Sequence, residues 1–376
     1  MRVLHINAGN MYGGVETFLI TLARQAHLCP DMEPAFGICF EGRFSEELAA
    51  AGAATYPLGA ARTRRFWTIW QSRQQLGRLF QCVSFDVVIC HMPWNLAVFG
   101  PEARRAEKKL AFWAHGPANG HGWLESWARW TPPDLAIVNS RFTAGSLPRL
   151  FADVPQRVIY YPVAPPEVEA GDALAVRQKL GVSKDTVVIV QVSRMEAWKG
   201  HRLHLQALGR LKDVPGWVCW MVGGAQRAVE LEYLNHLKRE AVRLGIADRV
   251  QFLGQRSDVR QILAAADIFC QPNEAPEPFG IVFIEALGAG LPVVTTRIGG
   301  GAEIISNTEC LVSPGDQEGL AEHLRRLINS PEERRALGRR GPERAKSLCD
   351  PETQINELHR TLTGLTRSAV SASAVS

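Results

Sequence analysis

Short runs of β-branched and other apolar residues recur along this chain, and helix-period stretches separate several of them. In the first half these runs lie at residues 3–7, 35–40, 86–91, 110–115, 134–140 and 157–163. The stretch after the first run has apolar residues at three- and four-residue steps, namely Val15, Phe18, Leu19, Leu22, Ala23 and Ala26. Strands that alternate with helices favour parallel pairing, so the pattern predicts a doubly wound α/β domain.

The segment 162–173, PVAPPEVEAGDA, interrupts this alternation with three prolines and several acids, and it predicts a linker. The pattern then restarts, with runs at 186–193, 217–224, 249–254, 268–272, 292–296 and 310–314. A length of 376 residues also fits two domains. We expect an N-terminal domain over 1–165, a C-terminal domain over 166–350, and a helix over 351–376 that returns to the N-terminal domain and ends in a disordered tail.

Composition narrows the class of protein. Hydrophobic residues make up 46% of the chain and charged residues 21%, as in ordinary globular proteins. A net charge of +4 suits anionic small ligands or an anionic membrane and gives no argument for nucleic acid. The eight cysteines form no CxxC pair, which favours reduced thiols. No apolar run approaches 18 residues, and the first strand follows the start directly, so we expect a cytoplasmic protein without a membrane span.

Ligands of parallel sheets bind beyond the carboxyl ends of the strands, so the loops after strands are the places to search. After the first strand, Gly13 and Gly14 stand where a helix begins, and free backbone N–H groups there would face an anion. The alternative is a Gly-Gly pair that only permits a tight turn. Neither GxGxxG nor a P-loop motif occurs.

Two cations follow the first strand of the second half. Arg194 and Lys199, five positions apart in SRMEAWKG, suit a diphosphate, because arginine offers a planar fork and lysine a point charge. The alternative is a solvated basic loop.

A later loop, PEPFGIVFIEALGAGLPVV (276–294), carries two glutamates eight positions apart. Glu277 lies between prolines, and Glu285 lies in an apolar run within a helix that we expect from Gly280 through Ala289. The helical rise puts Glu285 on the order of 10 Å from the turn, close to the separation of the sugar and the ribose in a nucleotide sugar. The alternative is one loop glutamate and one half-exposed helix glutamate.

These segments, GGVETF (13–18), SRMEAWKG (193–200) and EPFGIVFIEALGAGLPVV (277–294), together resemble glycosyltransferase family 4, the retaining GT-B glycosyltransferases. RVQFLG (249–254), DVRQILAAADIFCQP (258–272) and GGGAEII (299–305) fit the same family. The resemblance covers nearly the whole chain. It implies a GT-B fold, in which two Rossmann-like domains face one another across a cleft.

The resemblance also implies roles for the glutamate loop. Glu277 would contact hydroxyls of the transferred sugar, and Glu285 would accept hydrogen bonds from the ribose hydroxyls. Backbone N–H groups of Phe279, Gly280 and Ile281 would hold the sugar and the phosphate.

For the diphosphate, the resemblance implies that Arg194 and Lys199 neutralise the departing charge and that the Gly13–Gly14 turn closes on the phosphates. His115, in FWAHGP, matches a histidine near the donor sugar; the alternative is a satisfied histidine at a strand end.

Further matches line the nucleotide, at Gly223, Gly224 and Gly254, while Glu303 would be more structural. No Asp-x-Asp occurs, so Arg194 and Lys199 would take the place of a metal, and we expect no metal or other cofactor. The family retains the anomeric configuration of the sugar, and no carboxylate nucleophile is evident here. The resemblance therefore implies that the acceptor attacks the sugar from the face of the leaving phosphate, through an oxocarbenium-like transition state.

The acceptor half is less distinctive. Aromatic and polar loop residues after N-terminal strands could line an acceptor groove, namely Met11, Tyr12, His91, Trp94, Asn95 and Trp123. The segment 61–80 holds five arginines, no acid and several aromatics, and as an amphipathic helix it could lie on an anionic membrane. The alternative is a surface helix that packs Phe66, Ile69 and Trp70 onto the sheet.

We therefore expect a metal-independent retaining hexosyltransferase that moves a sugar from a nucleotide-diphosphate sugar to a hydroxyl of a glycan or lipid-linked acceptor. UDP is assumed only because it is frequent. The alternatives are transfer to a small molecule, a nucleotide-sugar epimerase of the same fold, and a non-catalytic nucleotide-sugar binder. The expected location is cytoplasmic, with the inner face of the membrane left open.

Overall fold

A computed structural model describes residues 1–165, 169, 171–305 and 308–373. The chain divides into two compact units, Met1–Ala164 with Cys349–Ser376, and Pro165–Leu348. Part of the predicted linker (166–168 and 170) and the last three residues of the predicted disordered tail (374–376) lie outside the described residues.

The first unit is built on a seven-stranded sheet in the order β3-β2-β1-β4-β5-β6-β7, with every pair parallel. Its strands are β1 (Arg2–Asn7), β2 (Glu33–Ile38), β3 (Ala54–Pro57), β4 (Val87–His91), β5 (Lys109–Ala114), β6 (Leu135–Val138) and β7 (Gln156–Val158). The predicted doubly wound parallel sheet is confirmed. β3 was not predicted, because ATYP is too short and mixed to read as an apolar run. β7 ends at Val158, well before the predicted 163.

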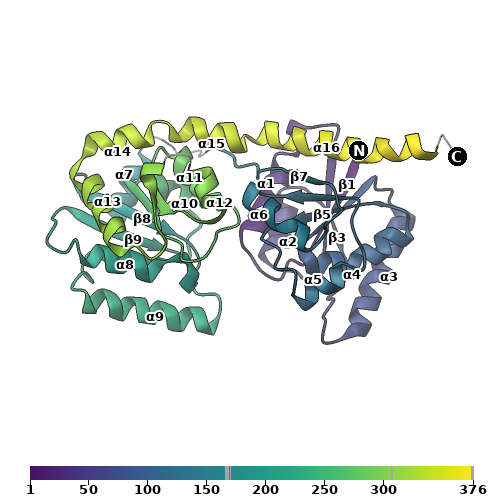
Figure 1. Ribbon diagram of the computed structural model, residues 1–376, viewed down its shortest axis with the longest axis horizontal. Coiled ribbons are helices and arrows are strands. Elements are labelled where there is room, and N and C mark those ends of the chain that lie inside the picture. The colour runs from purple at the N-terminus through teal and green to yellow at the C-terminus, as the bar shows by residue number, and fades with distance from the viewer. Residues whose placement is uncertain (166–168, 170, 306–307, 374–376) are drawn as a thin grey trace. The chain divides into compact units, whose positions relative to one another are not determined.

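Helices lie on both sides of this sheet (Figure 1). They are α1 (Gly14–Arg24), η1 (Ala26–Leu28), α2 (Arg43–Ala50), α3 (Phe66–Cys82), α4 (Met92–Arg105), α5 (Trp123–Ala128), α6 (Arg141–Ser146), η2 (Leu147–Arg149) and α16 (Pro351–Ser373). Strand side chains alternate between the two faces. On β1, Leu4 and Ile6 join a core with α3 and α4, and His5 and Asn7 therefore point to the opposite face.

The helix α4 contains a proline, Pro101, whose ring nitrogen cannot donate to the carbonyl of Ala97. Arg73 of α3 supplies the missing donor and a second hydrogen bond to the next carbonyl. Its Nη2 donates to the Ala97 carbonyl at 3.0 Å, and its Nε donates to that of Val98 at 2.6 Å. One of the five arginines of the segment 61–80 is therefore turned into the unit to hold α4, and is not a surface cation.

The C-terminal helix α16 belongs to the first unit. Its apolar side chains Ile355, Leu358 and Leu362 are buried, and the carbonyl of Cys349, just before the helix, accepts a hydrogen bond from the Val163 N–H at 2.9 Å. Burial of one apolar face explains why this long helix stays with the first unit.

The second unit repeats the arrangement with six parallel strands in the order β10-β9-β8-β11-β12-β13. They are β8 (Val187–Val192), β9 (Trp217–Val222), β10 (Val250–Gly254), β11 (Ile268–Gln271), β12 (Val293–Thr296) and β13 (Leu311–Val312). All six were predicted. One face carries α8 (His201–Gly209), α9 (Ala228–Arg243) and α13 (Gln317–Asn329), whose apolar residues join one core with the strands.

The remaining elements of this unit are α7 (Asp172–Lys179), η3 (Ala197–Lys199), α10 (Val259–Ala264), α11 (Ile281–Gly288), α12 (Gly299–Ile304), η4 (Thr308–Cys310), α14 (Pro331–Gly338) and α15 (Gly341–Cys349). The last residue of α15, Cys349, is counted with the first unit. None of the described helices is long and apolar enough to cross a membrane.

Candidate functional site

The strand order of the second unit places two loops side by side. β8 pairs with β11 in parallel, although the chain from β8 continues first to β9 on the other side. Such a reversal of strand order opens the crevice in which ligands of doubly wound sheets bind. The loop after β8 carries Arg194 and Lys199, and the loop after β11 carries Glu277. The structure thus brings together, in one unit, residues that the sequence predicted for one site.

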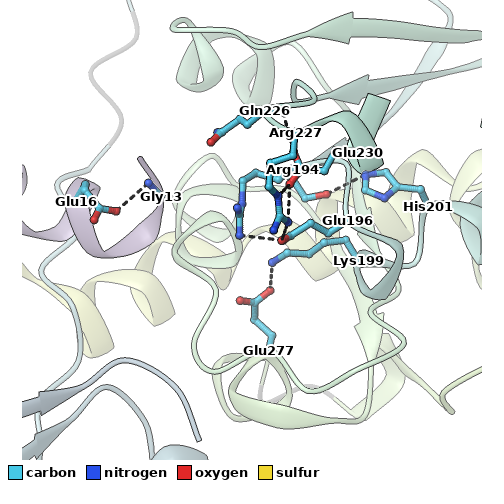
Figure 2. Close-up of polar contacts among 11 residues, drawn as sticks. Gly13, Glu16, Arg194, Glu196, Lys199, His201, Gln226, Arg227, Glu230 and Glu277 are labelled. Carbon is cyan, nitrogen blue, oxygen red and sulfur yellow. Dashed lines mark hydrogen bonds and ion pairs between the residues drawn. The ribbon is translucent and has the colours of Figure 1, made fainter. Parts of the chain in front are cut away.

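Between these two loops, Lys199 Nζ donates to Glu277 Oε2 in a close ion pair (Figure 2). Both side chains are largely buried, at 13% and 11% exposed. The ammonium group also lies 3.9 Å from the centre of the Trp198 ring, a cation–π contact. A buried ion pair of this kind satisfies two groups that would each be costly alone.

The backbone on either side of Glu277 rests on the glycines at the start of α12. Glu277 forms a parallel β-bridge with Gly299, and its carbonyl accepts from the Gly300 N–H at 2.6 Å. A Cβ at Gly300 would lie 2.2 Å from the Pro278 carbonyl oxygen. The segment GGGAEII therefore supports the Glu277 loop, because only glycine leaves room for it.

Arg194 belongs to a charged network that the sequence did not reveal (Figure 2). Its guanidinium pairs with Glu196 at 3.0 Å, and Arg227 reaches the same carboxylate at 3.2 Å. Arg227 also pairs with the buried Glu230 at 2.7 Å. Two cations thus share one carboxylate at the carboxyl edge of β8 and β9. The i,i+3 spacing of Arg227 and Glu230 was the available signal.

The carboxylate of Glu230 accepts hydrogen bonds from two neighbouring residues, Gln226 and Arg227. Burial raises its pKa, but hydrogen bonds from the Gln226 N–H and the Arg227 side chain bring the pKa below its usual value. An ionised Glu230 holds the loop that follows β9 in place.

The helix α11 begins directly after the Glu277 loop, within one residue of the predicted start. Gly280 precedes it with φ of 94°, a left-handed conformation that favours glycine. Phe279 is buried, and Ile281 is the first helical residue. Glu285, one turn further, is partly exposed. Its carboxyl group is nevertheless surrounded by protein, and this burial raises the pKa of Glu285 to about 7, although Arg260 of α10 opposes the shift.

The predicted nucleotide-lining glycines bring strand ends together. The Gly223 N–H donates to the Gly254 carbonyl at 2.8 Å, at the ends of β9 and β10. Gly223 has φ of 141°, and a Cβ there would lie 1.8 Å from the Ser193 carbonyl oxygen. A Cβ at Gly224 would lie 3.0 Å from the Gln255 Cβ, a tight but less severe contact. A side chain is thus excluded at Gly223 by the backbone of Ser193, whereas at Gly254 the space is open and only its φ of 68° favours glycine.

The Gly13–Gly14 turn of the first unit differs from expectation. The Gly13 N–H is not free, because it donates to Glu16 Oε2 at 2.9 Å (Figure 2). The other oxygen of Glu16 accepts from Asn7 Nδ2 at 2.9 Å. The buried Glu16 carboxylate therefore caps α1 at the place where the sequence predicted a bound anion. An anionic ligand could meet only the amides from Gly14 onward.

The predicted acceptor residues divide into buried and exposed sets. The expectation that all lie in loops is wrong: His91 ends β4, Trp94 and Asn95 lie in α4, and Trp123 begins α5. His91 and Asn95 are buried and do not line a groove. Met11 and Trp123 are exposed.

Tyr12 is held in its loop, with the Arg43 guanidinium 3.9 Å from its ring centre. His115 follows β5 and is also buried, and both of its ring nitrogens are hydrogen-bonded within the first unit. The predicted contact of His115 with a sugar therefore requires one of these bonds to be exchanged.

Comparison with known proteins places the chain in a family. The sequence model described as Glycosyltransferase Family 4 matches residues 12–165, and that described as Glycosyl transferases group 1 matches residues 172–344. The chain belongs to the family 4 type of GT-B glycosyltransferases.

Individual relatives agree with this assignment. Lipopolysaccharide core biosynthesis glycosyltransferase LpsE of Rhizobium meliloti is 32% identical over 169 residues, which cover 44% of this chain and 47% of the relative. D-inositol 3-phosphate glycosyltransferase of Segniliparus rotundus is 30% identical over 217 residues, covering 55% and 47%. The chain thus spans about half the length of the curated relatives it matches.

Among solved structures, Anabaena Alr3699/HepE, crystallised with UDP and glucose, has a TM-score of 0.85 and 24% identity. The match covers 97% of this chain and 100% of that one, and at this identity it shows the fold alone, which is GT-B.

Proposed function

We propose that this protein is a glycosyltransferase that takes a sugar from a nucleotide-diphosphate sugar and attaches it to an acceptor hydroxyl. The observation that carries the proposal is the contact between Lys199 and Glu277 at the strand-order reversal of the second unit. One group is suited to a diphosphate oxygen and the other to sugar hydroxyls, and they lie in the segment that matches Glycosyl transferases group 1.

The donor nucleotide that we propose is UDP. Support comes from Anabaena Alr3699/HepE, which has been crystallised with UDP and with UDP-glucose. Glu285 would accept hydrogen bonds from the ribose hydroxyls, for which its position on the second turn of α11 is suitable. The amides of Phe279, Gly280 and Ile281 at the start of that helix would face the sugar and phosphate.

The chemistry that we propose uses protein cations in place of a metal. As the sugar–phosphate bond breaks, negative charge grows on the diphosphate, and Lys199 and Arg194 would stabilise it. Because Lys199 would turn to the diphosphate, the Glu277 carboxylate would be able to hold the sugar hydroxyls in the oxocarbenium-like transition state. Retention of the anomeric configuration is part of the proposal and is supported by the resemblance to retaining enzymes.

The test is release of nucleoside diphosphate from UDP-, GDP- and ADP-sugars without an acceptor, with and without EDTA. We expect slow release from one nucleotide class, unchanged by EDTA and strongly reduced in Lys199→Ala. Glu232→Gln, on the exposed side of α9, is the control. An epimerised sugar would support an epimerase, and binding without turnover would support a binder. Loss with EDTA and rescue by Mn²⁺ would overturn the metal-independent chemistry.

We further propose that the acceptor is reached at an anionic membrane surface, to which the start of α3 binds. Phe66, Trp67 and Trp70 are 77%, 51% and 63% exposed, and only Ile69 packs inward. The alternative of three side chains packed on the sheet therefore fails for Phe66 and Trp70. Exposed Arg62, Arg64 and Arg65 precede them, and together they form the combination that binds anionic lipid surfaces.

Flotation with vesicles of neutral lipid, and of neutral lipid with phosphatidylglycerol, tests this membrane contact. We expect the protein to float only with the anionic vesicles. Charge reversal of Arg62, Arg64 and Arg65 to Glu should abolish flotation. The matched control reverses Lys212, Lys238 and Arg239, three exposed cations of the second unit, and should float normally. Equal loss in both triple variants would show a general charge effect and contradict a specific surface.

A further inference from the structure

Three histidines form a continuous row across one face of the first sheet. His5 of β1 is in register with Ile89, so His91 lies two residues further along β4 on the same face. His91 is in register with Trp113, so His115 lies two residues beyond that on the same side of β5. Each step brings the next ring closer to the carboxyl edge of the sheet.

Hydrogen bonds join the rings end to end. His5 Nδ1 lies 3.0 Å from His91 Nε2, and His91 Nδ1 lies 2.8 Å from His115 Nε2. His115 Nδ1 lies 2.5 Å from the hydroxyl oxygen of Tyr161, which also accepts from Asn139 Nδ2 at 3.1 Å. Neighbouring rings stack with centroids 5.2 and 5.0 Å apart.

The rings of this row are neutral. All three are buried, and burial lowers the pKa of His5 and His115 to about 3 and that of His91 well below its usual value. A neutral imidazole has one N–H and one acceptor nitrogen. The row therefore has only two hydrogen-bonded patterns, with the proton of every ring on Nδ1 or with the proton of every ring on Nε2.

The end of the row at His5 distinguishes the patterns. Among the described residues, His5 Nε2 has no hydrogen-bond partner and is buried. A buried N–H without a partner is rarer in proteins than a buried acceptor without one. The pattern with protons on Nδ1 leaves only an acceptor there. At the other end His115 Nδ1–H then donates to Tyr161, whose oxygen accepts from both His115 and Asn139 while its own hydrogen is directed away from these two residues.

We propose that His91 is a positioning residue that fixes His115 as a neutral hydrogen-bond donor through Nδ1, so that His115 does not act as a general base in turnover. The inference rests on the proposed function in so far as it gives His115 a part in turnover. His91 donates to the Nε2 of His115, and this leaves Nδ1–H as the atom that a ligand oxygen would meet in place of Tyr161. No proton is transferred in this role.

The tautomer is tested by nitrogen-15 NMR of the histidine side chains in the full chain without nucleotide, between pH 5.5 and 8. We expect three neutral rings with the proton on Nδ1 throughout. His5→Phe should leave the proton of His115 on Nδ1. If the protons were on Nε2 instead, this substitution would remove the acceptor of the His91 Nε2–H, and the protons of His91 and His115 would move to Nδ1. Protons on Nε2, a charged ring at pH 6, or reversal in His5→Phe would overturn the proposal.

Positioning is tested by the rate of nucleoside diphosphate release. We expect His91→Phe to lower the rate about tenfold at saturating donor, the effect of one lost hydrogen bond, with an altered His115 tautomer. His91→Gln retains a donor and should recover most of the rate. Equal rates in the two variants would overturn the positioning role.

If no sugar nucleotide is turned over, the proposed function and with it His115's part in turnover are wrong, while the tautomer is still decided by NMR. If His91→Phe does not fold, His5→Phe carries the tautomer test.

Discussion

Lys199 and Glu277, 78 positions apart in the sequence, contact one another across the loops that follow β8 and β11. Each side chain pairs with an opposite charge that would otherwise be buried without a partner. In the proposed function, a donor that binds here would replace this contact with phosphate and sugar oxygens. The ion pair would then hold the two loops in order without a ligand and open when the ligand binds.

Replacement of Lys199 by alanine should destabilise the protein. The Glu277 carboxylate would remain buried without its partner, at a cost of about 3 kcal/mol in the free energy of unfolding. The double variant Lys199→Ala with Glu277→Gln should recover most of this loss, because the uncompensated charge is gone. Urea unfolding of the wild type, both single variants and the double variant measures the coupling. Additive effects would show that the two groups are independent.

Donor affinity should rise with pH near neutrality. Because the pKa of Glu285 is raised to about 7, its carboxylate ionises only above that pH, and the ionised form accepts ribose hydrogen bonds better. The same shift lowers the stability of the folded state as pH rises through 7. A sugar nucleotide is the right probe, since its diester phosphates do not titrate there. Titration calorimetry at pH 6 and 8 should show tighter binding at pH 8, and Glu285→Gln should show no such difference.

Arg73 should be important for stability although it lies outside the candidate site. Arg73→Ala removes the donors to the Ala97 and Val98 carbonyls, and should cost about 2–3 kcal/mol in the free energy of unfolding. Pro101→Ala restores a backbone N–H that can reach Ala97, so Arg73→Ala should cost less in that background. Chemical unfolding of the four proteins checks this, and an equal cost in both backgrounds would contradict it.

Stability should fall in mild acid because of buried histidines. The folded-state pKa is lowered by burial to about 3 for His5, His115, His201 and His204. The unfolded chain binds protons below about 6.5 and the folded protein does not, so stability is full above that pH and falls below it, by about 1.4 kcal/mol per pH unit for each histidine.

His204→Asn should reduce the slope of this acid loss, because it removes one such group from the core. The exposed His236→Asn is the matched control and should leave the slope unchanged. The measurement is urea unfolding at pH 7.5, 6.5 and 5.5. The same slope in both variants would show that His204 is not a buried neutral group.

Much of the candidate site could be predicted because it depends on local sequence. Strand-to-helix alternation gave the sheets, and loops after strands gave Arg194, Lys199 and Glu277 one location. Their pairing could not be predicted, since it depends on β8 and β11 being neighbours. The engagement of the Gly13 amide by Glu16 could have been found, because a glutamate three residues after a helix cap is a known capping signal.

The histidine row and the inward turn of Arg73 needed the structure. His5, His91 and His115 come from separate strands, and only the register aligns them. The sequence gives no sign that Arg73 turns inward, because the Ala97 carbonyl lacks its helical donor only through Pro101, 28 residues after Arg73. Sequence periodicity reports which face is apolar, but it does not report which distant backbone group lacks a donor.

The division of the donor between two glutamates is tested most directly by calorimetric titration of UDP and of UDP-glucose into the wild type, Glu277→Gln and Glu285→Gln. Glu285→Gln should weaken binding of both ligands, because both carry the ribose. Glu277→Gln should leave UDP affinity near that of the wild type and weaken UDP-glucose alone. Equal losses of UDP affinity in the two variants would contradict the assignment of Glu277 to the sugar and Glu285 to the ribose.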